Sequence, residues 1–194
     1  MDTRPPAAKV FRLPSRVNRS KQRGNDSTGK AAREKVVNEK IKSRKELIPI
    51  VEALKREGKS VVFTNGCFDI LHVGHVRLLK QAKEHGHVLI VGLNSDESVR
   101  ALKGADRPFV PEADRAEVLA ALSSVDYVTI FGEVDPLSIV TDLKPDVLAK
   151  GEDWAEGTII GQDVVEAHGG TVVRIPFTSG SSTTNLIDKI RSGR

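Results

Sequence analysis

The sequence predicts an α/β protein, a Rossmann-like, doubly wound sheet of five parallel strands with flanking helices. Short apolar runs, rich in β-branched residues, alternate along the chain with segments of helical periodicity, and no hairpin-type turn joins two of the runs. The second run, residues 87–93, is apolar almost throughout, which is typical of a parallel strand that helices cover on both faces.

Each element follows from a local pattern. The expected strands are residues 60–64, 87–93, 126–131, 146–150 and 171–175. The expected helices are 44–57, capped by Ser43 and ended by Gly58; a helix from His72 to Gly86; 96–102; a helix from Glu112 with Val118, Leu119 and Leu122 facing inward; one from Pro136 to Leu143; 158–168; and a last helix near the C-terminus. Right-handed crossovers place the loops that follow the strands at one sheet edge, where α/β proteins bind ligands.

The charge is concentrated at the N-terminus. The net charge is +4, but the first 45 residues hold fourteen Lys or Arg and four Asp or Glu, which leaves sixteen basic and twenty-two acidic residues for the remainder. Residues 1–42 are therefore predicted to form a basic, largely disordered extension with a charged helix near residues 30–42, and residues 43–194 the domain. A basic tail can bind nucleic acid or anionic lipid, but this one lacks interleaved aromatic residues, so a solvated leader is the favoured interpretation and nucleic acid is not an expected partner.

Several classes of protein are disfavoured. No apolar run approaches the ~20 residues of a membrane span, and the basic N-terminus lacks the apolar core of a secretory signal. Cys67 is the only cysteine, so an intramolecular disulfide is impossible. Patterns of the C-x-x-C or H-E-x-x-H type are absent, so no tightly bound metal is expected. These observations predict a cytoplasmic protein.

Residues 61–75, VVFTNGCFDILHVGH, carry the strongest functional signal. They read as a strand, a turn at Asn65 and Gly66, and the start of a helix, which is the arrangement that binds phosphate in α/β proteins. His72 and His75 fall on one helix face, and the glycine between them, Gly74, lets a phosphate come close. Two surface histidines at a helix start are the alternative interpretation.

Three other loops at the same edge carry polar groups. Ser181, Ser182, Thr183 and Thr184 precede the last helix, where hydroxyls and backbone amides bind phosphate oxygens. Lys103 lies on a segment expected to be mobile and can neutralise phosphate charge or be a solvated surface lysine, while the nearby Gly104 and Arg107 favour a loop that binds phosphate. Lys150 ends the fourth strand and can face the ligand edge or form an ion pair at the edge of the core. Asp69 and Asp96 can bind a sugar hydroxyl or help to hold Mg²⁺, although Asp96 can equally be a helix cap.

GCFDILHVGH resembles the G-x-F-D-x-x-H-x-G-H motif of the cytidylyltransferase-like nucleotidyltransferases. The resemblance implies that both histidines contact a nucleoside triphosphate and stabilise the transition state at its α-phosphate, with the loop residues Asn65, Gly66, Cys67 and Phe68 at the nucleotide. TSGSSTT resembles the family's R-T-x-G-x-S-T-T motif, but Phe177 replaces the arginine, which argues against a cytidine preference. Arg115 resembles a helix arginine that packs near the site, with a surface ion pair as the alternative.

Residues 40–192 resemble more specifically the heptose-1-phosphate adenylyltransferases, through VVFTNGCFDILHVGH, LIVGLNSDESVRALKG and KPDVLAKGEDW. This resemblance implies ATP with Mg²⁺ as donor, heptose 1-phosphate as acceptor and a homo-oligomer. It also implies a separate heptose kinase, since the chain has no room for one. Lys150, Asp153 and Trp154 would contact the acceptor, although Glu152 replaces a glycine of the family pattern.

Three other functions stay open at this point. A glycerol-3-phosphate cytidylyltransferase shares the fold and the histidine motif, but Phe177 argues against it. An aminoacyl-tRNA synthetase fragment also carries H-x-G-H, yet this chain lacks a K-M-S-K-S loop. A non-catalytic nucleotide-binding regulator with a nucleic-acid-binding tail would bind ATP tightly without turnover.

Overall fold

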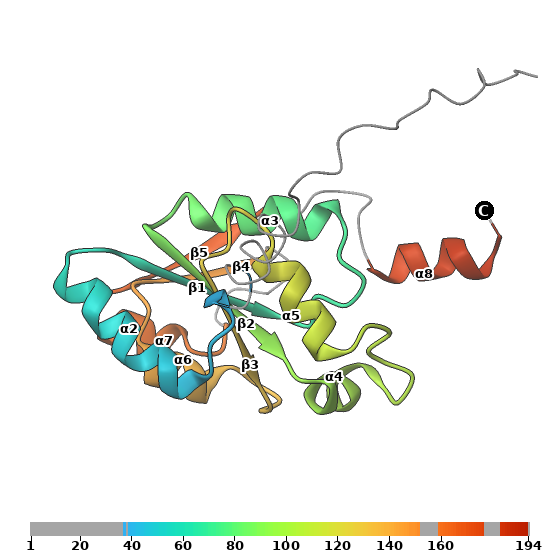
Figure 1. Ribbon diagram of the computed structural model, residues 1–194, viewed down its shortest axis with the longest axis horizontal. Helices are drawn as coiled ribbons and strands as arrows, with labels where there is room; N and C mark the ends of the chain where they lie inside the picture. Colours follow the sequence, from blue (N-terminus) through green and yellow to red (C-terminus); the bar gives the residue numbers. More distant parts are fainter. Residues whose placement is uncertain (1–36, 38, 152–158, 177–182, 194) are drawn as a thin grey trace, which may run out of the picture.

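Five parallel strands form one sheet in the order β3-β2-β1-β4-β5 (Figure 1), which confirms the predicted fold class. The structure is a computed structural model that describes residues 37, 39–151, 159–176 and 183–193. The strands are β1 (Val61–Gly66), β2 (Val88–Asn94), β3 (Tyr127–Phe131), β4 (Val147–Gly151) and β5 (Thr171–Ile175). The chain moves outward from β1 through β2 to β3 and then returns to the other side of β1, so the topological switch point lies between the carboxyl ends of β1 and β4.

Helices cover both faces of this sheet. The helices are α2 (Arg44–Arg56), α3 (Val73–Lys83), α4 (Asp96–Lys103), α5 (Glu112–Ala120), α6 (Leu137–Leu143), α7 (Gln162–Ala167) and α8 (Thr183–Arg191). Helix α8 has no buried residue and stands apart from the sheet (Figure 1). Alternation along β1 sends Val62 into the core cluster that contains Leu79 of α3, while Phe63 joins the opposite cluster with Leu47 of α2 and Ile139 of α6. Both faces of the central strand are therefore buried, as its apolar sequence predicts.

Two predicted helices differ from the observed ones. The buried face of α5 consists of Arg115, Ala116, Leu119 and Ala120. Val118 therefore points outward, with 46% of its surface exposed, and the prediction that it faces inward is wrong. Helix α7 is shorter than the expected 158–168, because Gly161 in a left-handed conformation (φ +93°) precedes its first turn.

Residues just before the predicted domain boundary pack against the domain. Ile41 forms a parallel bridge with Val128 of β3, and the amide of Lys42 donates to the carbonyl of Val128 at 2.9 Å. The ammonium of Lys40 donates to the carbonyl of Val125 at 2.7 Å. Ile41 and Lys42 thus extend the edge of the sheet, although the predicted boundary places residues 39–42 in the tail.

None of the helices in the part of the chain that the structure describes combines the length and the apolarity needed to cross a membrane.

Candidate active site

A cavity of about 670 Å³ opens at the carboxyl edge of the sheet. Its volume is in the range of small-molecule sites in proteins. The sequence-predicted residues in its wall are Asn65, Gly66, Cys67, Phe68, Asp69, His75, Lys103, Arg107, Lys150, Thr183 and Thr184. Four chain segments that are distant in sequence therefore meet at one site, as the predicted topology requires.

Some predicted site residues are not in this wall. His72, Gly74 and Asp96 are not among the described residues that line the cavity. Ser181, Ser182, Asp153, Trp154 and Phe177 lie outside the residues that the structure describes.

The two histidines form a stacked pair at the start of α3. Their ring centroids are 3.8 Å apart with an interplanar angle of 23°. The amide of Gly74 donates to Nδ1 of His72 at 3.1 Å, and the amide of His72 donates to Nδ1 of His75 at 3.4 Å. Since each Nδ1 accepts a hydrogen bond, the proton of each neutral ring lies on Nε2, which leaves Nε2–H as the donor for a ligand.

Burial keeps both rings neutral near pH 7. Burial, together with a smaller contribution from the neighbouring His72, lowers the pKa of His75 to about 4. Burial also lowers the pKa of His72. The pair therefore offers hydrogen-bond donors without positive charge, so the neutralisation of an anionic ligand depends on other residues.

The loop between β1 and α3 is strained and firmly anchored. Phe68 (φ +45°) and Ile70 (φ +52°) are in the left-handed region, which is costly for a β-branched residue such as Ile70. Asp69, between them, is almost fully buried and accepts hydrogen bonds from the amides of Phe109 at 2.9 Å and Val110 at 3.0 Å. The ring of Phe68 packs edge-on against His75, with centroids 5.3 Å apart. The anchored loop thereby fixes one of the two histidines.

Asp69 also forms a 2.6 Å ion pair with Nε of Arg107. Burial alone raises the pKa of Asp69, but the amide of Phe109, the guanidinium of Arg107 and the amide of Val110 outweigh it, so the pKa lies below its usual range. This carboxylate anchors the segment after α4 to the loop that precedes α3. The sequence analysis expected that segment to be mobile. Two expectations stay predictions: that Asp69 contacts a hydroxyl or Mg²⁺, and that Arg107 contacts phosphate.

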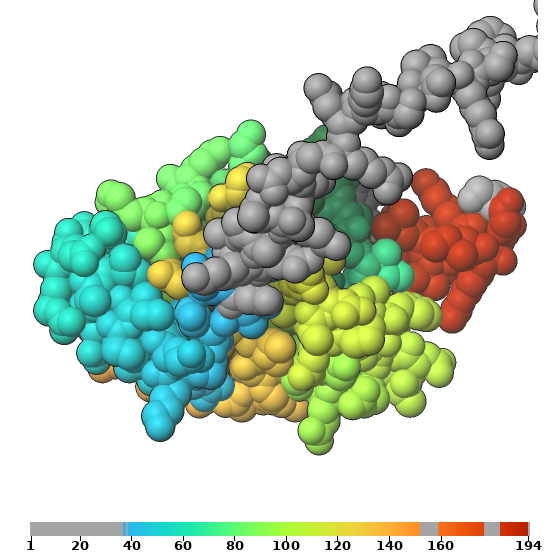
Figure 2. All heavy atoms as spheres, in the orientation of Figure 1, coloured from blue at the N-terminus to red at the C-terminus, as the bar shows by residue number. Residues whose placement is uncertain are grey.

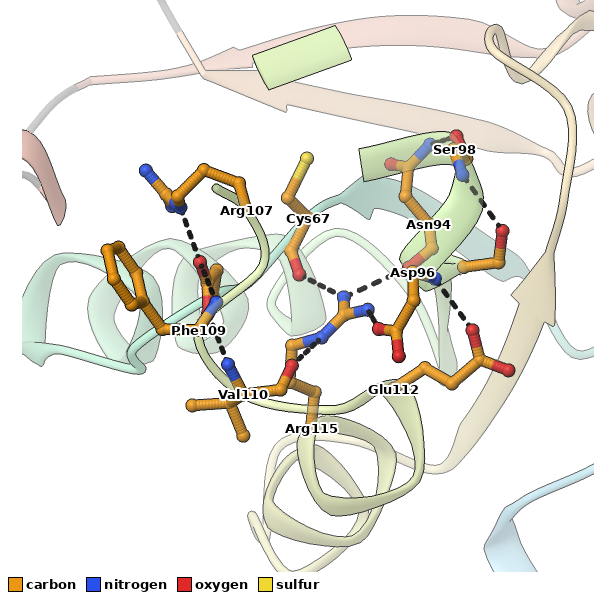
Figure 3. Close-up of polar contacts among 11 residues, drawn as sticks. Cys67, Asn94, Asp96, Ser98, Arg107, Phe109, Val110, Glu112 and Arg115 are labelled. Carbon is orange, nitrogen blue, oxygen red and sulfur yellow. Dashed lines mark hydrogen bonds and ion pairs between the residues drawn. The ribbon is translucent and has the colours of Figure 1, made fainter. Parts of the chain in front are cut away.

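Arg115 is at the centre of a network of polar contacts that includes Cys67 and Asn94 (Figure 3), two residues that line the cavity. Its side chain is buried and donates to the carbonyls of Cys67 at 2.5 Å, Asn94 at 2.9 Å and Val110 at 2.9 Å. It also pairs with the Asp96 carboxylate at 2.7 Å. One guanidinium thus holds together four residues from three segments, and the alternative of a surface ion pair for Arg115 is wrong. The sequence feature that could have predicted this burial is the position of Arg115 on the apolar face of α5.

Positive charge reaches the cavity from two lysines. Lys150, at the end of β4, is only 6% exposed and donates to Oδ1 of Asn65 at the end of β1. Lys103 ends α4 and is exposed. These ammonium groups complement a ligand with phosphate charge.

The amino-terminal end of α8 completes the site. The Thr183 hydroxyl donates to the carbonyl of Asp69 at 3.1 Å, and Thr184 also lines the cavity. In Figure 2, α8 (red) stands at the margin of the body beside the segment that follows β1. A helix start with hydroxyl groups suits phosphate oxygens, so the hydrogen-bond donors, the cations and the helix terminus in this wall are groups of the kind that an anionic ligand requires.

Comparison with known proteins decides the family. A family model described as cytidylyltransferase-like matches residues 63–187. The chain belongs to the cytidylyltransferase-like family. It is 56% identical over 151 residues to the bifunctional protein HldE of Geobacter metallireducens, which is 78% of this chain and 31% of that protein. It is 54% identical over 154 residues to HldE of Geotalea uraniireducens, again covering 31% of the relative. The chain thus spans about a third of the length of these relatives.

Solved structures agree with this cytidylyltransferase-like fold. A lipopolysaccharide core biosynthesis protein from Thermoplasma volcanium matches with a TM-score of 0.52 and 28% identity over 63% of this chain and 99% of that one. A pantoate-beta-alanine ligase from Francisella tularensis matches with a TM-score of 0.52 at 17% identity, over 76% of this chain and 75% of that one, which shows the fold alone.

Proposed function

We propose that this member of the cytidylyltransferase-like family transfers AMP from ATP to D-glycero-D-manno-heptose 1-phosphate, which yields ADP-heptose and pyrophosphate. The observation that carries the proposal is the cavity, which combines His75, Lys150 and the start of α8 at the topological switch point. The acceptor is supported by the likeness to HldE, which extends over 78% of the chain.

The reaction needs no covalent enzyme intermediate. An oxygen of the acceptor phosphate attacks the α-phosphorus of ATP in line, and the bond to the β-phosphate breaks with its electron pair leaving on pyrophosphate. The Nε2–H groups of His72 and His75 donate to phosphate oxygens as charge builds in the transition state. Lys103 binds the departing phosphates, and Thr183 and Thr184 bind the β- and γ-phosphates at the start of α8.

Mg²⁺ bound to ATP would supply charge neutralisation for the triphosphate. The described residues contain no group of three or more His, Cys, Asp or Glu side chains placed to hold a metal. The triphosphate oxygens and water are the ligands that Mg²⁺ commonly keeps in such sites. The proposal also implies an upstream kinase that makes the sugar 1-phosphate and a cytoplasmic reaction, while a homo-oligomer stays a prediction.

The specificity is tested by pyrophosphate release from purified protein with Mg²⁺. ATP or CTP is combined in turn with heptose 1-phosphate or glycerol 3-phosphate. We expect release only with ATP and heptose 1-phosphate. Pyrophosphate release with CTP and a polyol phosphate would keep the reaction type but overturn the proposed substrates. ATP binding without release from any pair would indicate a non-catalytic nucleotide-binding regulator.

A further inference from the structure

We propose that Asn94, which Ser98 orients, accepts a hydrogen bond from a hydroxyl of the acceptor sugar, and that the cavity wall around it binds the sugar part of the acceptor. This inference rests on the proposed function and assigns a substrate contact to the last residue of β2, which has no part in the adenylyl transfer described above.

A chain of hydrogen bonds fixes which way the amide of Asn94 faces. The hydroxyl of Ser98, in the first turn of α4, donates to the carbonyl of Glu133 at 2.9 Å. A carbonyl can only accept, so the single proton of this hydroxyl is used there, and the Ser98 oxygen accepts from Nδ2 of Asn94 at 2.8 Å (Figure 3). The amide nitrogen of Asn94 therefore points toward Ser98, and its Oδ1 points away from it.

This amide oxygen is open to the cavity, although Asn94 itself is buried. Asn94 is 3% exposed and lines the cavity. Within the part of the chain that the structure describes, no group donates to its Oδ1, and the only fully buried side-chain polar atom without a partner is Oγ1 of Thr129. Oδ1 of Asn94 thus keeps accessible surface, which the cavity provides. A fixed acceptor in this place requires a ligand with a donor, because covering a polar group without a partner is costly.

The surrounding wall suits a sugar better than a phosphate. Asp135 adds a carboxylate to the same cavity, and neither this group nor Oδ1 of Asn94 can donate to a phosphate oxygen. Leu102 and Val134 line the cavity with 43% and 57% of their surface exposed, so they can pack against the C–H groups of a sugar ring. Acceptors for hydroxyls and apolar surface for C–H groups are what a neutral polyol requires.

The strand order places this wall away from the groups proposed to bind the triphosphate. The start of α8 is hydrogen-bonded to the loop that follows β1, and Lys150 ends β4. Asn94 ends β2, and Val134 and Asp135 follow β3, so they lie on the other side of β1 from β4. In-line attack puts the acceptor opposite the departing pyrophosphate. With the pyrophosphate at α8, the sugar of the acceptor therefore lies toward β3.

Steady-state kinetics test the contact. For Asn94→Ala we expect the KM for heptose 1-phosphate to rise by about tenfold, as for the loss of one hydrogen bond to a ligand. Its kcat and its KM for ATP should stay within about twofold of the wild type. Ser98→Ala retains the amide but releases its orientation and should raise the same KM by at least about threefold. Thr129→Val, which removes a buried hydroxyl that is not among the cavity-lining residues, is the matched control and should behave like the wild type.

Monodeoxy analogues of heptose 1-phosphate identify the hydroxyl. Loss of the hydroxyl that Asn94 binds should lower kcat/KM about tenfold for the wild type but less than about twofold for Asn94→Ala, whereas every other analogue should affect both proteins equally. Circular dichroism checks the fold, and Ser98→Ala carries the test if Asn94→Ala misfolds.

Three results would overturn the inference. These are an acceptor KM within about twofold of the wild type for both variants, an equal rise in the KM for ATP, and the absence of coupling between Asn94 and any acceptor hydroxyl. If the wild type does not turn over heptose 1-phosphate, the proposed function fails instead, and the coupling must then appear with a hydroxyl of the phosphate ester that the protein does accept.

Discussion

The buried histidine of the motif predicts an acid-sensitive fold. Folding lowers the pKa of His75 from 6.5 to about 4, so between these values the unfolded chain binds more protons than the folded one. Stability must therefore fall as the pH drops through this window. The perturbation that isolates the effect is His75→Asn, which keeps a polar side chain at the helix start but cannot titrate.

The magnitude follows from the two pKa values. At about pH 7.5 the His75 ring is neutral in both the folded and the unfolded protein, so its titration changes the free energy of unfolding by almost nothing. At about pH 5 it is protonated in most unfolded chains but in few folded ones, which costs the wild type about 2 kcal/mol, and the limit below pH 4 is about 3 kcal/mol. His75→Asn should lose about 2 kcal/mol less than the wild type over the same pH change.

Urea unfolding followed by circular dichroism at these two pH values gives the required free energies of unfolding. His85→Asn, which changes an exposed histidine at the end of α3, is the matched control and should decline as the wild type does. Equal declines for wild type and His75→Asn would refute the argument, because the folded protein would then carry a histidine of ordinary pKa and the neutral-donor role would lose its basis.

Three other changes test the fold around the site. Arg115→Lys leaves several buried acceptors without a donor and should lower the free energy of unfolding by about 2–4 kcal/mol, measured in urea. Gly92→Ala places a Cβ 2.6 Å from a buried phenylalanine ring and should cost about 1–3 kcal/mol, whereas Gly132→Ala, with its nearest neighbour 3.9 Å away, should be nearly neutral. Deleting residues 1–30 should leave the kinetics unchanged, but deleting 1–42 removes the bridge to β3 and should lower the melting temperature; equal melting temperatures would contradict this attachment.

The fold could be predicted because each strand carries its own signal. Runs such as residues 87–93 are apolar on both faces, and a strand of that kind is stable only within a covered parallel sheet. The histidine motif was equally local, since both rings and their caps lie within four residues. The first strand was predicted to end at residue 64, yet β1 continues to Gly66 and carries Asn65 into the cavity.

What the sequence could not supply was long-range polar pairing. Arg115 reaches acceptors up to 48 residues away, and Asp69 is bonded to amides 40 and 41 residues away. Hydrophobic periodicity reports which face of a helix is buried but not which polar partners meet there, so it suggested Val118 for the inner face of α5, where Arg115 lies. The same limit left the partner of Lys150 open between a phosphate and an ion pair.

The most direct test of adenylyl transfer in this cavity compares the wild type with His75→Ala. Pyrophosphate release is followed with ATP, Mg²⁺ and heptose 1-phosphate, and the circular dichroism spectra show whether the fold is intact. We predict that turnover falls by about 10²–10³ while the spectrum is unchanged. Turnover near that of the wild type would contradict the account, because the reaction would then not depend on the histidine that the cavity presents.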